Sequence, residues 1–239
     1  MSKLSNTFKW PKEIPAQSQE QKERADDFMN YWLSIIKGKY GLVETFNHKY
    51  PLLGGKSFST TLELGAGRCA HLSYETLTPE QEKGYYAIEY RSAIADIARK
   101  AYPRINVMTA DCQKQLPFPD AHFDRVLAIH VLEHLPDLPA TIKEVKRLLK
   151  PTTGTFSIVI PCLESPAYTT VQRFTSARLY KQRYDKPYAE FIDREHINSP
   201  EEIIHVLKAH KFNITRRIGF PMVVPYTPIN LCMGLTATV

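Results

Sequence analysis

The chain has 239 residues, enough for one α/β domain with an appendage and a large core. Hydrophobic residues make up 43% and charged residues 23% of it, which is ordinary for a globular protein. The net charge is +6, and mixed-sign runs such as 143–147 favour a solvated surface over a nucleic-acid footprint. We therefore do not expect nucleic acid as a partner.

The cysteines are scattered along the chain and form no Cys-x-x-Cys pair. They are Cys69, Cys112, Cys162 and Cys232. This pattern favours free, buried thiols in a reducing compartment over disulfides or a zinc cluster. The sequence has neither a run of about 18 apolar residues nor an apolar signal core at its start. We therefore expect a cytoplasmic protein without a membrane span.

Residues 1–57 are expected to form an N-terminal arm and a lid helix. Residues 18–21 match a capping box, and apolar side chains then recur at helical spacing. This stripe consists of Phe28, Tyr31, Trp32, Ile35 and Ile36. Gly38 and Gly41 are expected to end the helix, and a connector should follow over 42–57. Two interpretations of the stripe stay open: a cover over a ligand, or ordinary packing against the core.

From residue 58 onward, strand patterns alternate with helical patterns. Strands are expected at 58–64, 85–89, 105–109, 123–130, 154–160, 212–219 and 231–239. Helices are expected at 68–77, 92–101, 138–149 and in a segment that begins after the N-cap Ser199. Strands joined by helices in this order predict right-handed βαβ units and a mostly parallel sheet. No internal repeat is visible.

The segment 162–197 interrupts this alternation and is too long for a simple loop. Aromatic and basic side chains are interleaved in it, including Tyr168, Arg173, Phe174, Arg178, Tyr180, Lys181, Arg183, Tyr184, Lys186, Tyr188 and Phe191. We expect a helical insert over the carboxyl edge of the sheet. It could select the substrate, pack as a half-buried lid on the sheet, or do both. Because basic residues alternate with aromatic ones, RNA also stays open as an acceptor.

A sharp glycine turn follows the first predicted strand. Gly65-x-Gly67-x-x-Ala70 resembles a nucleotide-binding turn, in which residues without side chains let a ligand approach the backbone. Amides at the start of the expected helix 68–77 would then face that ligand. Glu89 ends the second strand 22 residues after Gly67, where an acid accepts hydrogen bonds from ribose hydroxyls. These features predict an adenosine-containing ligand without naming it.

Further residues narrow the class of ligand. Glu63 lies inside the first strand, Asp111 follows the third, Leu116-Pro117-Phe118 comes next, and Val131-Leu-Glu-His-Leu follows the fourth. With these motifs in order over roughly 58–161, the chain resembles the class I S-adenosylmethionine-dependent methyltransferases, in particular the small-molecule branch that includes the ubiquinone and menaquinone methyltransferases. The resemblance implies an α/β domain over 58–239 with a Rossmann-like, seven-stranded, mostly parallel sheet.

The resemblance also implies how the cofactor, S-adenosylmethionine, is held. The implied binding residues are Glu63, Gly65 and Gly67 at the methionine portion, Glu89 at the ribose, Asp111 and the Cys112 amide at the adenine, and Ile129 beside the sulfonium. Cys69 stands where the family often has a third glycine. Nicotinamide cofactors are disfavoured, because they do not explain Asp111 or the Leu-Pro-Phe segment.

Histidines are the candidate catalytic residues. They are His130, His134 and His196. A base is needed only if the acceptor keeps a proton with a pKa well above 7, as an alcohol or phenol does, and histidine suits that task. The expected reaction is methyl transfer to a small molecule, with oxygen favoured. A nucleic-acid methyltransferase and a non-catalytic protein that binds the cofactor are the rival functions, and each histidine has a structural interpretation too.

No metal is expected, although one metal-binding hypothesis stays open. Some O-methyltransferases of the ubiquinone pathway and of small-RNA ends carry Glu-x-x-Glu-His at this place and bind a divalent cation. Here the pattern is His130-x-x-Glu133-His134, with His196 downstream, and the first glutamate is missing. Two imidazoles and a carboxylate would still suit a transition metal.

Overall fold

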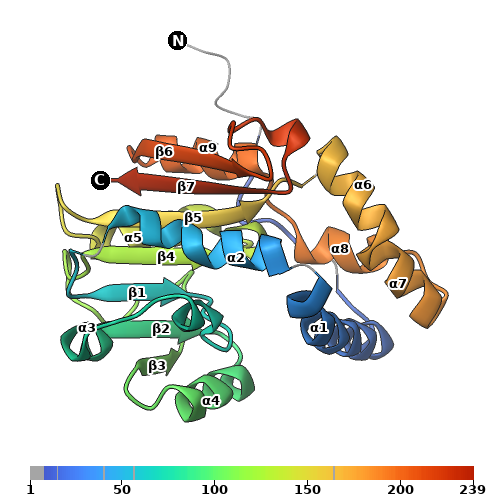
Figure 1. Cartoon of the computed structure of the whole chain (residues 1–239), viewed down its shortest axis with the longest axis horizontal. Helices are drawn as coiled ribbons and strands as arrows, with labels where there is room; N and C mark the ends of the chain where they lie inside the picture. The colour runs from blue at the N-terminus through green and yellow to red at the C-terminus, as the bar shows by residue number, and fades with distance from the viewer. Residues whose placement is uncertain (1–7, 15, 40, 56, 164) are drawn as a thin grey trace.

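The computed structural model describes residues 8–14, 16–39, 41–55, 57–163 and 165–239 of the chain. The expectation about the first residues, up to Asn6, lies outside this range. Seven strands form one sheet in the order β3-β2-β1-β4-β5-β7-β6 (Figure 1). Strand β7 is antiparallel to β5 and β6, and the other pairs are parallel. The expected α/β fold with a mostly parallel, Rossmann-like sheet is confirmed.

The strands occur in the expected order, and the helices differ from the expected ones at 41–49, 68–77 and 79–83. The strands are β1 Thr61–Leu64, β2 Tyr85–Glu89, β3 Asn106–Thr109, β4 Arg125–Ile129, β5 Thr155–Pro161, β6 Asn213–Phe220 and β7 Cys232–Thr238. The α-helices are α1 Gln19–Lys39, α2 Gly41–Lys49, α3 Pro79–Lys83, α4 Ser92–Ala101, α5 Leu138–Leu148, α6 Pro166–Phe174, α7 Ser176–Tyr184, α8 Ala189–Glu195 and α9 Pro200–Ala209. Short 3₁₀ helices are η1 Tyr50–Gly54, η2 Ala70–Ser73, η3 Leu132–His134 and η4 Thr227–Ile229.

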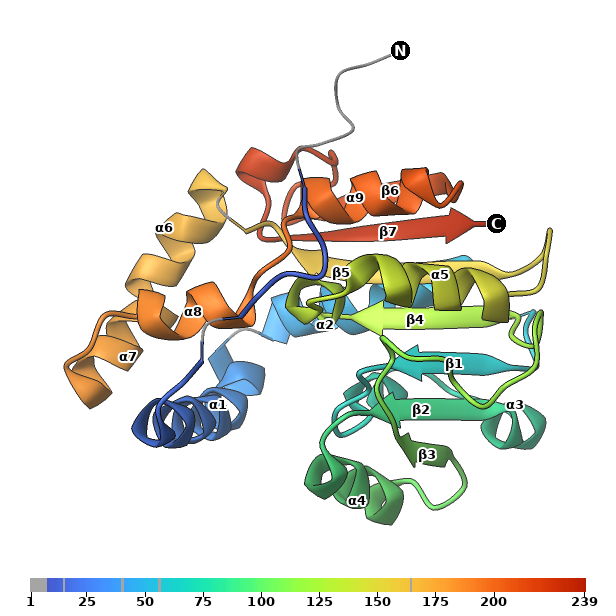
Figure 2. The same ribbon diagram turned by 180° about the vertical axis from the view of Figure 1, so that it is seen from behind.

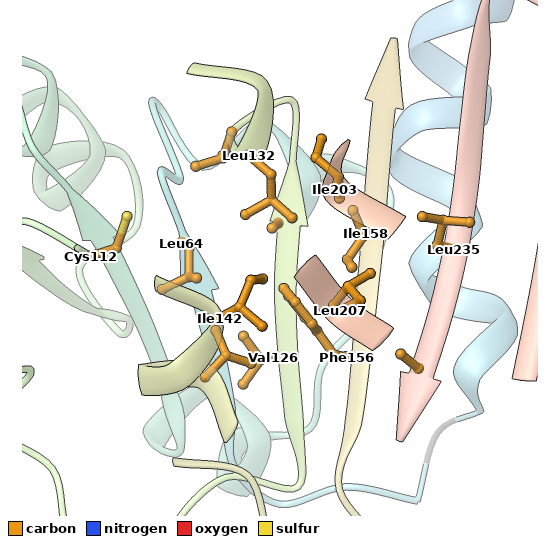
Figure 3. Close-up of a cluster of buried hydrophobic side chains, with 14 of the residues drawn as sticks. Leu64, Cys112, Val126, Leu132, Ile142, Phe156, Ile158, Ile203, Leu207 and Leu235 are labelled. Carbon is orange, nitrogen blue, oxygen red and sulfur yellow. The ribbon is translucent and has the colours of Figure 1, made fainter. Parts of the chain in front are cut away.

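The main core lies between the sheet and the helices α5 and α9, which cover one face (Figure 2). Alternate residues of β1 point into it, so Leu62 and Leu64 are buried there while Glu63 faces the other side. Figure 3 shows how side chains from β4, β5, β7 and α9 meet in this layer. Helix α2 crosses the opposite face (Figure 1). The four cysteines are buried and free, as expected.

Strand β1 begins at Thr61, three residues later than predicted. The reason is that the Asp124 side chain binds the backbone amides just before it. The Asp124 carboxylate accepts hydrogen bonds from the amides of Ser59 and Thr60, both at 2.9 Å, and from Lys150 at 2.6 Å. Burial opposes its charge, but the Lys150 ammonium and these two amides hold the pKa of Asp124 at about 2. The carboxylate therefore fixes the start of the central strand.

We expect Asp124→Asn to remove part of the acid sensitivity of folding. A depressed pKa contributes stability above the unfolded value near 4, which is lost as pH falls towards 2. The wild-type free energy of unfolding should fall by about 1–2 kcal/mol more than that of the variant between these pH values. Urea unfolding at stepped pH measures this. Equal slopes for the two proteins would contradict it, and Asp96→Asn, in an exposed pair with Arg99, is the control.

The expected helix over 68–77 is wrong. Cys69 has a left-handed φ of 56°, and only the 3₁₀ turn η2 follows it. His71 Nε2 lies 3.1 Å from Glu75, whose carboxylate binds buried Arg125 at 2.8 Å through both oxygens. The contact between Glu75 and Arg125, which are 50 residues apart, holds the segment against the start of β4. The expected row of helix amides facing a ligand is therefore absent from this described segment.

The expected connector over 42–57 is also wrong. Helix α1 continues through Gly38 to Lys39, and Gly41 starts the second helix α2 instead of ending the first. Tyr50, directly after α2, is buried, and its ring lies so close to β7 that a Cβ on Gly234 would be 2.2 Å from the ring. This contact ties the segment to the sheet. Of the predicted apolar stripe, the side chain of Ile36 lies outside the described residues.

Phe28, Tyr31 and Trp32 of the stripe pack on the helices that follow β5. Phe28 is buried against Tyr180 and Phe191, with ring centroids 5.0 and 5.3 Å away. Tyr184 and Tyr188 also contact Phe28, and Arg183 binds Asp27. These aromatic residues form a cluster separate from the main core, so α1 packs on α7 and α8 and not on the sheet.

Candidate functional site

The two glycines in the turn after β1 have different structural environments. Gly65 and Gly67 both have a φ of 56°, a conformation that glycine adopts without strain. A Cβ on Gly65 would lie 2.6 Å from the Val131 side chain, whereas one on Gly67 would meet open space. Gly65 is therefore required by packing against the end of β4. At Gly67 the described chain leaves an open cradle, with no atom within 4 Å of where a Cβ would lie.

Glu89 and the glycine turn meet directly. One oxygen of the buried Glu89 carboxylate accepts the amide N–H of Gly67 at 3.0 Å. The other oxygen accepts the amide N–H and the guanidinium Nε–H of Arg91 at 3.0 and 3.1 Å. The Glu89 side chain thus stands beside the open space at Gly67, with its position fixed by hydrogen bonds from both sides. This arrangement fits the adenosine-containing ligand expected from the sequence.

Glu63 lies in the interior beneath the turn. Its carboxyl group accepts a 2.8 Å hydrogen bond from the hydroxyl of Tyr85, the first residue of β2. Burial raises the pKa of Glu63, although the nearby His71 partly opposes the shift. The contact between Glu63 and Tyr85 does not follow from the sequence motif, because Tyr85 begins a different strand.

Asp111 lies on the loop after β3, next to the end of β2. The amide of Ala110, between β3 and Asp111, donates to the Glu89 carbonyl at 3.2 Å. One oxygen of Asp111 accepts the amide N–H and side-chain N–H of Gln113 at 3.0 and 3.2 Å, and Gln113 in turn accepts from the Asp137 amide at 2.7 Å. The loop is thereby tied to the start of α5. Cys112, beside Asp111, is buried.

His130 follows directly on Ile129, the last residue of β4. It has a left-handed φ of 53°, which is uncommon for residues other than glycine and frequent at functional sites. Its Nδ1 lies 3.1 Å from the Glu133 carboxylate. Burial alone would lower the pKa of His130, but contacts with Cys232 and Glu133 raise it well above its usual value.

Glu133, His134 and His196 come together although 62 residues separate the last two. The backbone carbonyl of Glu133 accepts the amides of Ile197 and Asn198 at 2.8 and 3.0 Å, which brings the segment after α8 onto η3. The His134 and His196 rings are 5.2 Å apart. One donor atom from each of these three side chains lies within 4.8 Å of the others.

Burial and neighbouring charges shift the pKa values of Glu133 and His196. Burial would raise the pKa of Glu133, but the His130 hydrogen bond and the His134 charge hold it at about 2. Burial lowers the pKa of His196 to about 4, so this imidazole is neutral at pH 7. One Glu133 oxygen and His196 Nδ1 are buried without a hydrogen-bond partner among the described residues. A pocket of about 180 Å³ between α6, α8 and the start of α9 is lined by His196.

Helix α2 contributes groups that the sequence reasoning missed. It packs on η2, and its His48 stacks on Tyr74 with ring centroids 4.9 Å apart. Glu44 lies 3.6 Å from His48. Buried side-chain atoms of Asn47 and His48 have no hydrogen-bond partner in the described part of the chain. The signal available in the sequence was the helical spacing of Val43, Phe46, Asn47 and Tyr50 across the supposed connector.

Known proteins match this chain in its central part and in its fold. The methyltransferase domain family matches residues 62–157. A 2-phytyl-1,4-naphtoquinone methyltransferase of Nostoc punctiforme is 23% identical over 218 residues, 87% of this chain and 90% of that protein. A sterol 4-C-methyltransferase of Caenorhabditis elegans is 46% identical over 48 residues, 20% of this chain and only 14% of that protein.

A solved structure agrees in fold. The crystal structure of a SAM-dependent methyltransferase of Thermotoga maritima, described as a possible histamine N-methyltransferase, has a TM-score of 0.57 at 19% identity. The likeness covers 90% of this chain and 98% of that one. The strand order and the turn beside an acid at the end of β2 thus define a class I methyltransferase fold. Residues 62–157 thus carry a methyltransferase domain, and S-adenosylmethionine is the cofactor of the methyltransferases that the chain is similar to in sequence and in fold.

Proposed function

We propose that the chain methylates a small molecule, and that the accepting atom is oxygen. The observation that carries this proposal is the gathering of His130, His134 and His196 around Glu133 at the carboxyl end of β4. An alcohol or phenol must lose its proton during methylation, and a positioned base serves that need. The naphthoquinone named for the Nostoc relative supports a small-molecule acceptor.

The cofactor residues keep the roles that the resemblance implies. Gly65 and Gly67 would hold the methionine portion, Glu89 the ribose hydroxyls and Asp111 the adenine amino group. Glu63 would face the methionine portion together with the two glycines, the Cys112 amide would meet the adenine, and Ile129 would lie beside the sulfonium. The open space at Gly67 and the Glu89 side chain beside it fit this cofactor. When bound, S-adenosylmethionine supplies a methyl group on a positively charged sulfur.

The three histidines have different parts in this proposal. His130, with its raised pKa, is a cation that balances the buried Glu133. His196 is neutral and lines the pocket, so it accepts the proton of the acceptor hydroxyl and passes it to water. His134 donates from Nδ1 to the Glu195 carbonyl and holds the segment before His196. Alignment of acceptor and methyl group contributes on the order of 7–11 kcal/mol in favourable cases.

We expect His196→Ala to lower kcat by about a hundredfold without changing cofactor affinity, since one base contributes about 10²–10⁴ in rate. The wild-type rate should be independent of pH near neutrality and fall as pH drops towards 4, because His196 must be unprotonated. The rate of the variant should instead rise steadily with pH. A screen of phenolic and alcoholic metabolites with methyl-labelled cofactor supplies the assay. Methylation of nitrogen or carbon alone would overturn the proposal of an oxygen acceptor.

A second role for this group is metal binding, and one observation favours it. Donor atoms of Glu133, His134 and His196 lie within 4.8 Å of one another, and the carboxylate has a buried oxygen without a partner among the described residues. Metal analysis of the purified protein and Co²⁺ absorption spectra decide between the two roles. A metal ion that resists dialysis and restores activity after chelation would replace the base by an ion that polarises the acceptor oxygen.

Two rival functions can be distinguished from this proposal. One is cofactor binding without catalysis, and the other is methylation of nucleic acid. A protein that only binds the cofactor needs no acceptor pocket, and the pocket beside His196 argues against it. A nucleic-acid methyltransferase would label RNA from the same cells in the same assay. The compartment in which the protein works is proposed, from its cysteine usage, to be the cytoplasm.

A further inference from the structure

The loop between β6 and β7 displays large apolar side chains to solvent. Met222, Val223, Val224 and Tyr226 are exposed, Val223 by 73% and Val224 by 61%. The sequence from 218 to 239 contains no charged residue or histidine. Scattered exposed apolar residues are ordinary, but several from one loop mark an interaction surface.

The loop is held in this shape by a buried side chain. Asn230 is fully buried, and its amide N–H groups donate to the carbonyls of Val224 and Tyr226 at 2.8 and 2.9 Å. Its oxygen accepts the Met222 amide at 2.9 Å. A Cβ on Gly219 would lie 2.3 Å from the same Asn230 side chain, so the base of the loop is close-packed too. The apolar side chains are thus presented by a rigid loop.

Basic side chains lie on the neighbouring helices. Helix α6 packs beside η4, and α7 follows it along the same edge of the molecule (Figure 1). Residues 166–187 carry one acid, Asp185, and these cations: Arg173, Arg178, Lys181, Arg183 and Lys186. Within the described part of the chain, Arg183 alone among them has an ion pair, with Asp27. The other four line a groove together with the exposed ring of Phe174.

We propose that the 222–226 loop and the basic groove of α6 and α7 form a surface that binds an anionic lipid bilayer. Apolar side chains enter the boundary between headgroups and acyl chains, and cations beside them bind lipid phosphates. Strand β6 runs parallel to β1, so the loop leaves the sheet at the same edge as the glycine turn. No helix among the described residues is long and apolar enough to cross a membrane, so the contact is peripheral.

The test is sedimentation of the full chain with vesicles of phosphatidylcholine alone or mixed with phosphatidylglycerol. We expect binding to the mixed vesicles only, weakened by salt. Val223→Asp with Val224→Asp should lower the partition coefficient at least tenfold, as should Arg178→Glu with Lys181→Glu. The matched controls, Ile97→Asp and Lys100→Glu on exposed positions of α4, should bind as the wild type does. Circular dichroism confirms that each variant is folded.

Several outcomes would overturn the proposal. Two of them are wild-type protein that the anionic vesicles do not retain, and a loop variant that binds them as well as the wild type does. A wild-type dimer that the loop variant converts to a monomer in light scattering would make the loop an interface between copies of this chain. Binding of labelled single-stranded RNA by the groove, without vesicle binding, would assign the cations to nucleic acid. Calorimetry with S-adenosylmethionine tests the cofactor site separately, so failure there leaves the membrane surface standing.

Discussion

Replacing Glu89 by glutamine is expected to weaken S-adenosylmethionine binding about a hundredfold. The carboxylate accepts the Gly67 amide and is proposed to accept the ribose hydroxyls. Hydrogen bonds to a charged group contribute about 1.5–3 kcal/mol each, and 1.4 kcal/mol corresponds to a factor of ten in Kd. Glutamine keeps the shape of the side chain and loses the charge, so the variant isolates the electrostatic part. Titration calorimetry measures the change.

The control for Glu89→Gln is Glu80→Gln, on an exposed position of α3. It makes the same chemical change away from the turn and should leave the Kd unchanged. A Glu89→Gln protein that is folded and binds the cofactor with wild-type affinity would show that the ribose is held elsewhere. Alanine at 89 should weaken binding further, because it also frees the Gly67 amide and Arg91.

Alanine at the two glycines of the turn should separate folding from binding. Gly65→Ala incurs the left-handed backbone penalty and also forces a Cβ into the Val131 side chain, so we expect a loss of about 2–5 kcal/mol in the free energy of unfolding. Gly67→Ala meets no clash and costs only the left-handed backbone penalty of roughly 1–2 kcal/mol. Its Cβ lies in the open cradle, however, so cofactor affinity should fall at least tenfold.

Each of these two variants serves as the control for the other, because both place alanine at the same φ of 56°. Their difference in unfolding free energy reports the Val131 contact, and their difference in affinity reports the cradle. Urea unfolding without ligand and calorimetry with cofactor measure the two quantities. If Gly67→Ala binds the cofactor as tightly as the wild type, the ligand does not approach the backbone there.

The sequence predicted the elements in which local pattern and tertiary packing agree. The ranges 85–89 and 92–101 match β2 and α4, because an apolar run and a helical period determine them locally. The segment 68–77 was predicted wrongly because Glu75 binds the distant Arg125 and His71 binds Glu75, and these contacts override its helical spacing. Helix α2 was missed because its glycine-flanked sequence resembles a linker.

In the site, too, some residues could be placed from the local sequence and others depend on contacts between distant segments. Glu89 and Asp111 could be placed from sequence, because residues at the ends of neighbouring parallel strands meet at one sheet edge. The meeting of Glu133 with His196 could not be deduced from spacing. It depends on two backbone hydrogen bonds from Ile197 and Asn198 to one carbonyl, and no side-chain pattern encodes them.

The aromatic cluster around Phe28 has a consequence for how the molecule opens. It joins α1, near the start of the chain, to α7 and α8, and it shares no side chain with the main core. Segments that pack on each other more than on the core open as one cooperative unit, at a free energy below that of global unfolding. In native-state hydrogen exchange, amides of α1 and α7 should therefore share one opening free energy, while those of β4 and β5 exchange only on complete unfolding.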